Sequence, residues 1–285
     1  MTRYLDPKND LTFKRIFGEH KHLCMSLLNS MLPLENPIAS IEYLPAELTP
    51  VIPEKKNSIV DVRCTDQTGR QFIVEMQMFW TDSFASRVQF NACKAYVKQL
   101  AKGKDYKLLQ PVYALAFVND IFQPEKLDDY YHHYKMVNIK DTNEQIEGLE
   151  FVFIELPKFK PSNRGEKKLH ELWLDFLNIQ DATHEVPKDL FEEADTREAL
   201  GYLEEGTYSE AEMLLYDKYW DTVSIERTLH SDGFAEGKTE GEHTKAMAVA
   251  AKALQMGMNI EAIVELTGLT SEEIAELDTE TNDRP

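Results

Sequence analysis

Two carboxylates occupy positions in the sequence that would bring them together in a folded chain. Segments 58–65 and 70–78 alternate apolar and polar residues in the manner of β-strands. The connection 67–69 ends in Gly69 and suits a three-residue hairpin loop. If this loop closes the hairpin, position 65 pairs with 71 and Asp61 lies directly opposite Glu75. Their Cβ atoms would then be about 5 Å apart.

Such a pair points to metal chemistry. Two like charges facing each other across a strand pair are destabilising, and a bound divalent cation reverses the sign of that interaction. Carboxylates with a nearby amide oxygen are hard ligands that suit Mg²⁺, which also takes substrate phosphates. The alternative is that Asp61 and Glu75 lie on a solvated sheet face, where acidic residues are common. Geometry alone leaves both interpretations open.

The elements around this pair predict an α/β domain over residues 1–160. Helices are expected where apolar residues recur at helical spacing, and strands where the period shortens towards two or where apolar runs are short and β-branched. The helices are predicted at 9–18, 20–31 and 83–102, and the strands near 38–44, 58–65, 71–79, 112–118 and 151–155.

The alternation also predicts which side chains share a face of the hairpin. In the second strand Ile73, Glu75 and Gln77 fall on one face, opposite Phe72 and its neighbours at even positions. In the first strand Asp61 falls opposite a face made by Val60, Val62 and Cys64.

Charge divides the chain into two unlike parts. The formal net charge is −19, yet residues 1–165 carry 21 Lys and Arg against 21 Asp and Glu. Residues 166–285 carry 10 against 29, so all of the excess acidity lies there. Phosphate binding needs local positive potential, which a neutral domain with clustered Lys can supply. The net charge therefore does not exclude a nucleic-acid partner for the first part.

The remaining composition indicates a cytoplasmic protein. No apolar run approaches the 18 residues of a membrane span, and the first residues lack the apolar core of a secretion signal. Three cysteines at wide spacing suit buried thiols in a reducing compartment better than disulfides or a zinc site.

Beyond residue 160 the sequence predicts only helices. Residues 161–232 read as an acidic helical region, and residues 233–285 as a glycine-repeat linker with a small helical unit. The repeat is Gly233, Gly237 and Gly241, which would either line one helix face or form a flexible hinge.

The end of the chain shows helix-capping signals. Asn259 precedes one short apolar helix, and a capping box, Thr270 to Glu273, opens the last. The outline resembles a helix-turn-helix, but the second helix carries three Glu and no basic residue, which phosphates would repel. We therefore expect an assembly role, such as homo-oligomerisation, for this region.

The order of motifs resembles a known family. The segments are 9–18 (NDLTFKRIFG), Val60-Asp61, Glu75-Met76-Gln77, Arg87, 103–113 (GKDYKLLQPVY), the glycine repeat and 266–274 (LTGLTSEEI). Together they resemble the PD-(D/E)XK nuclease family transposases, also described as recombination-promoting nucleases. The resemblance implies a restriction-endonuclease-like mixed sheet flanked by helices.

The resemblance further implies a metal-dependent DNA endonuclease. By this resemblance Asp61, Glu75 and the backbone carbonyl of Met76 would bind Mg²⁺, with Mn²⁺ as a second candidate. Gln77 stands where the wider superfamily has a lysine, which puts turnover in doubt. Asp10 is a candidate third acidic residue, with a helix-cap role as the alternative.

Basic residues provide candidate contacts to DNA. Lys14 would touch phosphate or pair with Asp10. Arg87 and a lysine series are spaced so that several share a face of the predicted helix 83–102, which is either a phosphate-binding ridge or an ordinary solvated face. The series is Lys94, Lys98, Lys102 and Lys104.

The rival function is a catalytically weak or inactive nuclease fold that acts as a DNA-binding, regulatory or protein-interaction module. Two further features receive structural interpretations. The pair His132-His133 is predicted to lie in a surface loop, and the aromatic residues Phe151, Phe153 and Phe159 are predicted to be core residues rather than a base-stacking platform.

Overall fold

The computed structural model describes residues 3–48, 56–161, 168–180 and 186–282. The chain divides into two compact units, Met1–Asp221 and Thr222–Pro285. Helix α6 (Glu210–Gln255) begins in the first unit and continues in the second. None of the helices in the described ranges combines the length and the apolar composition that a membrane-spanning segment needs.

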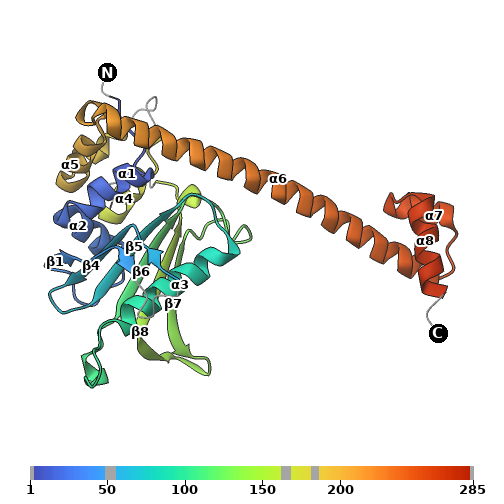
Figure 1. Ribbon diagram of the computed structural model, residues 1–285, viewed down its shortest axis with the longest axis horizontal. Helices are drawn as coiled ribbons and strands as arrows, with labels where there is room; N and C mark the ends of the chain where they lie inside the picture. Colours follow the sequence, from blue (N-terminus) through green and yellow to red (C-terminus); the bar gives the residue numbers. More distant parts are fainter. Residues whose placement is uncertain (1–2, 49–55, 162–167, 181–185, 283–285) are drawn as a thin grey trace. The chain divides into compact units, whose positions relative to one another are not determined.

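A six-stranded mixed sheet forms the centre of the first unit among the described residues (Figure 1). The β5–β6 and β6–β8 pairs are parallel, and the other pairs are antiparallel. This arrangement confirms the predicted α/β class. In spatial order the strands are β1 (Ile41–Tyr43), β4 (Val62–Asp66), β5 (Gln71–Gln77), β6 (Val112–Val118), β8 (Asp141–Glu155) and β7 (Tyr131–Asn138). A separate ladder joins β2 (Glu47–Leu48) to β3 (Ser58–Ile59).

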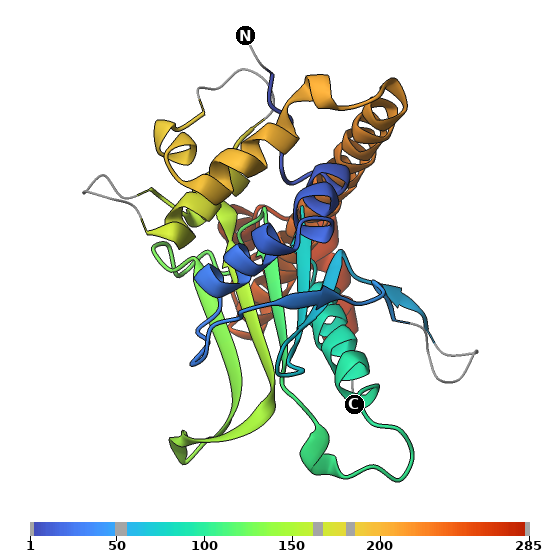
Figure 2. The same ribbon diagram turned by 90° about the vertical axis from the view of Figure 1, so that its left-hand side faces the viewer.

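Helices from both ends of the first unit cover one face of the sheet (Figure 2). The core there joins alternate sheet residues, such as Phe72 and Val74, to the rings of Phe17, Trp173 and Phe176. Residues 169–177 and 194–203 therefore share a core with the sheet. The covering helices are α1 (Asp10–Phe13), the π-helical turn η1 (Lys14–Gly18), α2 (Lys21–Met31), α4 (Leu169–Leu177) and α5 (Ala194–Leu203). Turns of 3-10 helix lie at Tyr106–Leu108, Leu156–Lys158, Lys188–Phe191 and Glu205–Thr207.

Helix α3 (Asp82–Val97) covers the opposite face. Its buried side includes Phe84 and Val88, which pack against β6 and Phe153. The helix ends five residues earlier than predicted, with Lys98 as its C-cap. Lys102 therefore lies beyond the helix, as Lys104 does, and the part of the predicted helix face that included Lys102 is wrong.

The β4–β5 hairpin turns as the sequence predicts. Gly69 has a φ of 90°, a left-handed conformation that favours glycine. Asp66 fixes the turn because its carboxylate accepts hydrogen bonds from the Thr68 and Arg70 backbone N–H groups, and the Arg70 Nε lies 2.7 Å from its other oxygen. The predicted pairing of Thr65 with Gln71 is confirmed.

Strand β7 was missed from the sequence, and the surface-loop prediction for His132-His133 is wrong. Both residues lie in β7, paired with Phe153 and Val152 of β8. Because β7 is an edge strand with exposed residues over most of its length, it lacks the apolar alternation that reveals a strand. Phe153 and Phe159 are buried, as predicted, and Phe151 packs partly buried against the α3-side core.

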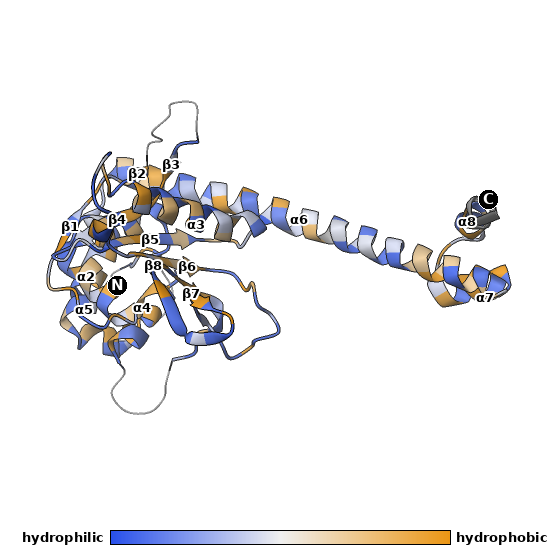
Figure 3. Ribbon diagram, turned by 90° about the horizontal axis from the view of Figure 1, so that it is seen from below, coloured by the Kyte–Doolittle hydropathy of each residue, from blue (hydrophilic) through white to orange (hydrophobic). Residues whose placement is uncertain are grey.

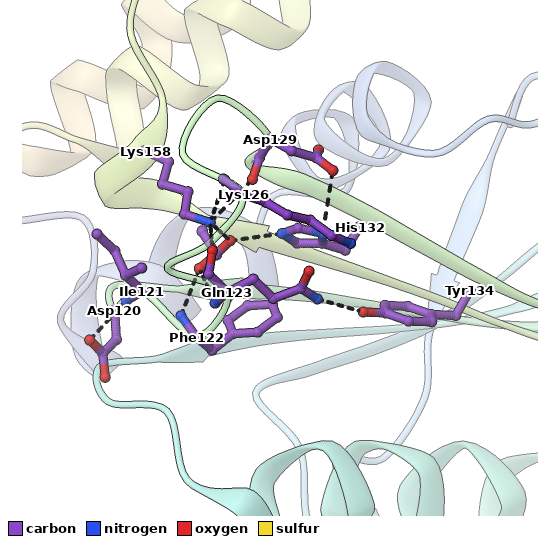
Figure 4. Close-up of polar contacts among 10 residues, drawn as sticks. Asp120, Ile121, Phe122, Gln123, Lys126, Asp129, His132, Tyr134 and Lys158 are labelled. Atoms are coloured by element: carbon purple, nitrogen blue, oxygen red, sulfur yellow. Dashed lines mark hydrogen bonds and ion pairs between the residues drawn. The ribbon is translucent and has the colours of Figure 1, made fainter.

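A buried polar network joins the ends of β7 and β8 (Figure 4). The Glu155 carboxylate accepts hydrogen bonds from Lys158 Nζ (2.5 Å), His132 Nε2 (2.7 Å) and the Phe122 N–H (2.6 Å). Burial alone would raise the pKa of Glu155, but the hydrogen bonds from these donors and from the Gln123 N–H lower it. Lys158 also donates to backbone carbonyls of the loop before β7, so one ion pair fixes that loop to the sheet.

The second unit contains the remainder of α6, then α7 (Ile260–Thr267) and α8 (Ser271–Asn282). Helix α6 is unbroken through the glycine repeat, which favours the helical alternative over a hinge. Figure 3 shows mostly hydrophilic and neutral residues along this repeat. Asn259 caps α7, and Glu273 accepts hydrogen bonds from Thr270 at the start of α8, so the predicted caps are confirmed.

We predict that Lys158→Met lowers the free energy of unfolding by about 3–5 kcal/mol, because it removes the lysine partner of the buried Glu155 carboxylate and leaves it only the His132 and backbone hydrogen bonds. Chemical denaturation followed by tryptophan fluorescence measures the change. Lys160→Met is the matched control, since Lys160 is exposed, and it should change stability by about 0.5 kcal/mol or less. Equal effects of the two substitutions would contradict this account of the network.

Candidate active site

Asp61 lies at a break between two strands. β3 ends at Ile59 and pairs with β2, and the ladder between β4 and β5 ends where Val62 pairs with Val74. Asp61 therefore lies one residue beyond the ladder. Its carboxylate accepts a hydrogen bond of 2.8 Å from the Met76 backbone N–H, so β5 fixes its position.

The same break corrects the face predicted for Val60. Val60 packs in the α3-side core, whereas Val62 and Cys64 pack in the core on the opposite side of the sheet. Simple alternation fails because the chain is not in a regular strand at Val60 and Asp61.

Glu75 extends from β5 towards helix α3 and is only 4% exposed. Its Oε1 accepts a hydrogen bond of 3.0 Å from Asn91 Nδ2, and Asn91 is itself fully buried in α3. Sequence reasoning missed Asn91. The available signal was a polar residue on the apolar face of a helix, where it needs a polar partner.

Burial raises the pKa of both carboxyl groups, and a neighbouring carboxylate raises each further, Asp10 for Asp61 and Asp61 for Glu75. Burial raises the pKa of Asp61 to about 6, although the hydrogen bond from the Met76 N–H and the charge of Lys14 lower it in part. Burial and the charge of Asp61 raise the pKa of Glu75 to about 7, against a lowering by Asn91 and Arg87. The two predicted carboxylates are therefore close enough to interact, in a site where water stabilises them poorly.

Gln77 and Arg87 lie beside this pair. Arg87 Nη2 donates a hydrogen bond of 2.6 Å to Gln77 Oε1 and lies 3.7 Å from Glu75 Oε2. The Arg87 guanidinium also lies 4.9 Å from the centre of the Phe84 ring. The structure thus places the only arginine predicted for DNA contact against the Glu75 carboxylate.

Asp10 and Lys14 reach the same region from α1 and η1. Lys14 Nζ lies 2.6 Å from an Asp10 carboxylate oxygen, and the Asn9 side chain, rather than Asp10, caps α1. Both charges influence the pKa of Asp61. They also line a cavity of about 430 Å³, together with Glu212 and Tyr219 at the start of α6.

Lys94 is held by the fold. Its ammonium donates to the carbonyls of Leu48 and Lys56 and to the Ser58 hydroxyl, at 2.6, 2.8 and 3.1 Å. These three hydrogen bonds use all its N–H groups and secure the β2–β3 ladder to α3. Lys98 is half-buried at the end of the same helix.

The donor set fits a hard divalent cation. Two adjacent carboxylates that repel each other, one half-buried and one buried, would be stabilised by such an ion, and both offer oxygen ligands. Within the described ranges no three acidic, His or Cys side chains lie close enough together to hold a metal. The set therefore rests on Asp61, Glu75 and backbone or water oxygens, and Asp10 is not brought in as a third ligand.

We predict that Asp61→Asn with Glu75→Gln stabilises the protein at pH 8 in the absence of divalent cations. Because both pKa values are raised, the folded state binds more protons than the unfolded state between about pH 4 and pH 7, so wild-type stability falls as pH rises through that window. Neutral amides remove this loss, and the expected gain is about 3 kcal/mol.

Denaturation in EDTA at pH 8 and pH 5 measures this effect. At pH 5 the carboxyls of the folded wild type are still largely protonated, so most of the loss has not yet occurred and the difference in stability should be clearly smaller than at pH 8. A variant that is less stable than wild type at pH 8 would show that the carboxylates do not repel each other in the folded protein.

Comparison with known proteins identifies the family. The model of the PD-(D/E)XK nuclease family transposases matches residues 7–225, which include the sheet, α3 and every candidate site residue. Neither the curated proteins nor the solved structures include a match. The match covers most of the chain, and this protein therefore belongs to the PD-(D/E)XK nuclease family transposases.

Proposed function

We propose that this protein is a Mg²⁺-dependent DNA endonuclease that hydrolyses phosphodiester bonds. The observation that carries the proposal is the pair formed by the half-buried Asp61 and the buried Glu75, with pKa values raised to about 6 and about 7. A fold that needed only stability would gain by replacing two repelling carboxylates. Retaining them is reasonable where they bind a cation that the reaction needs.

The residues of the site would divide the work. Met76 holds Asp61 through its N–H, and Asn91 holds Glu75, so both carboxylates are fixed before a ligand arrives. A bound Mg²⁺ would polarise a phosphoryl oxygen and lower the pKa of a bound water. The cavity beside Asp10 and Lys14 would admit the DNA backbone, with Lys14 available to a phosphate once it separates from Asp10.

The family description supports a wider proposal. Activity on DNA during recombination or in mobile elements would agree with a family of nuclease-type transposases. We further propose that the protein acts in the cytoplasm, with Mn²⁺ able to replace Mg²⁺. The helical unit that ends the chain would mediate homo-oligomerisation, since its exposed apolar side chains include Met256 and Leu266.

We predict that Asp61→Asn and Glu75→Gln each lower plasmid cleavage by a factor on the order of 10³, because each removes a ligand and a negative charge from the cation site. Purified wild-type protein is assayed with Mg²⁺, with Mn²⁺ and with EDTA beside both variants. Cleavage should require the metal and both carboxylates.

Asp82→Asn provides the matched control. Asp82 is an exposed acidic residue in the first turn of α3, outside the site, and its loss should leave cleavage unchanged. If the wild type binds DNA but does not cut it under any of these conditions, the neutral Gln77 has cost the protein its turnover. The non-catalytic DNA-binding function then replaces the one proposed.

A further inference from the structure

We infer that Arg87 is a catalytic residue that supplies, from helix α3, the positive charge that the neutral Gln77 cannot place at the scissile phosphate. The inference rests on the proposed nuclease function and deepens it. In this chain β5 carries no cation next to Glu75, so we assign the stabilisation of phosphate charge to a residue of helix α3.

Three contacts hold the guanidinium at the site. Gln77 accepts a hydrogen bond of 2.6 Å from Nη2, Glu75 Oε2 lies at 3.7 Å, and the ring of Phe84 lies beneath the group at 4.9 Å. The Arg87 side chain nevertheless remains 48% exposed. The group is thus fixed on its inner side and open to a substrate on its outer side.

Gln77 has the right chemistry to orient this arginine. Its Nε2 donates to the Phe79 carbonyl at 3.0 Å, which turns Oε1 towards Arg87. A lysine at position 77 would instead bring a second positive charge against the guanidinium. Gln77 and Arg87 therefore form a matched pair, in which a neutral acceptor on the strand positions a cation on the helix.

The other nearby cations are engaged elsewhere. Lys14 is paired with Asp10 at 2.6 Å, and the ammonium of Lys94 donates to two carbonyls and a hydroxyl. Of the ion pairs among the described residues, Arg87–Glu75 is the one that includes a carboxylate of the candidate site.

Phosphodiester hydrolysis needs such a group. Water adds its oxygen to phosphorus and loses a proton to solvent. The bond from phosphorus to one sugar oxygen breaks, and that oxygen leaves with the electron pair and is protonated. Negative charge spreads over the non-bridging oxygens during this exchange. A guanidinium presents two parallel N–H donors that match those oxygens, and it keeps its charge at any working pH.

We predict that Arg87→Gln lowers the rate of cleavage at saturating DNA by about 10²–10³-fold, the usual effect of removing a group that stabilises transition-state charge. Two further readouts separate this role from a structural one. DNA affinity in Ca²⁺ should change by about fivefold or less, and Mn²⁺ affinity, measured calorimetrically without DNA, should be unchanged or tighter because a competing positive charge is gone.

The double variant Gln77→Lys with Arg87→Gln tests the exchange of charge directly. It returns the cation to β5 and should recover at least about tenfold of the rate lost in Arg87→Gln. Lys140→Gln removes one exposed charge from the β7–β8 turn and serves as the control, with cleavage unchanged.

Three results would overturn the inference. They are wild-type rates in Arg87→Gln, a loss of Mn²⁺ affinity as large as the loss of rate, or no recovery in a double variant that melts at the wild-type temperature. The first experiment establishes that the wild type cleaves DNA and that Asp61→Asn abolishes this cleavage. If the wild type does not cut, the proposed function fails and this role fails with it; if only Arg87→Gln is without effect, the nuclease stands and the role of Arg87 alone is lost.

Discussion

The site is organised around one unfavourable interaction, the approach of the half-buried Asp61 carboxylate to the buried Glu75 carboxylate. Burial raises the pKa of both carboxyl groups, and the charge of Asp61 raises the pKa of Glu75 further. They stay in place because each is fixed by a neutral donor, the Met76 N–H for one and the Asn91 amide for the other. Neutral donors fix position without cancelling charge, so the negative potential of the pair remains available to a cation. Arg87, 3.7 Å from Glu75, offsets part of this negative potential without removing it.

The order of strands in the sheet places a paired strand on each side of β5, the strand that carries Glu75. β5 pairs with β4 on one edge and with β6 on the other, and the parallel β5–β6 pairing requires a crossover connection. That connection is α3, which returns across the face where Glu75 lies and delivers both Arg87 and Asn91, one helical turn apart. The helix that the topology requires is thus also the helix that completes the site. The opposite face carries the large aromatic core around Trp173, so the strands of the site rest on a rigid layer.

Local patterns predicted much of this arrangement. The hairpin register, the turn at Gly69, the buried strand Val112–Val118 and the caps of the last two helices are all set by residues near one another in sequence. The errors lie where a residue's environment comes from elsewhere. The edge strand β7 is buried only near its start and has no apolar alternation. His132 is buried there because it contacts Glu155 and Phe122, which are distant in sequence. The contacts of Asn91 and Arg87 with the site depend on how α3 packs against the sheet. The hydrogen bonds of Lys94 depend on the β2–β3 ladder, whose residues lie 36 and 46 positions earlier in the chain.

The charge distribution explains how an acidic protein is compatible with a polyanionic substrate. The half of the sequence that forms the sheet and the site is neutral overall, and the excess of negative charge lies in residues 166–285. Salt screens the effect of distant charges beyond about 10 Å. The electrostatic potential at the site is therefore set by the few charged groups around it. There, Lys14 is paired with Asp10 and Arg87 with Glu75, which leaves the local balance negative while Asp61 is ionised. A site with that balance attracts a divalent cation before it attracts a phosphate. The order is physically sensible, because the cation changes the sign of the potential that the DNA backbone then meets.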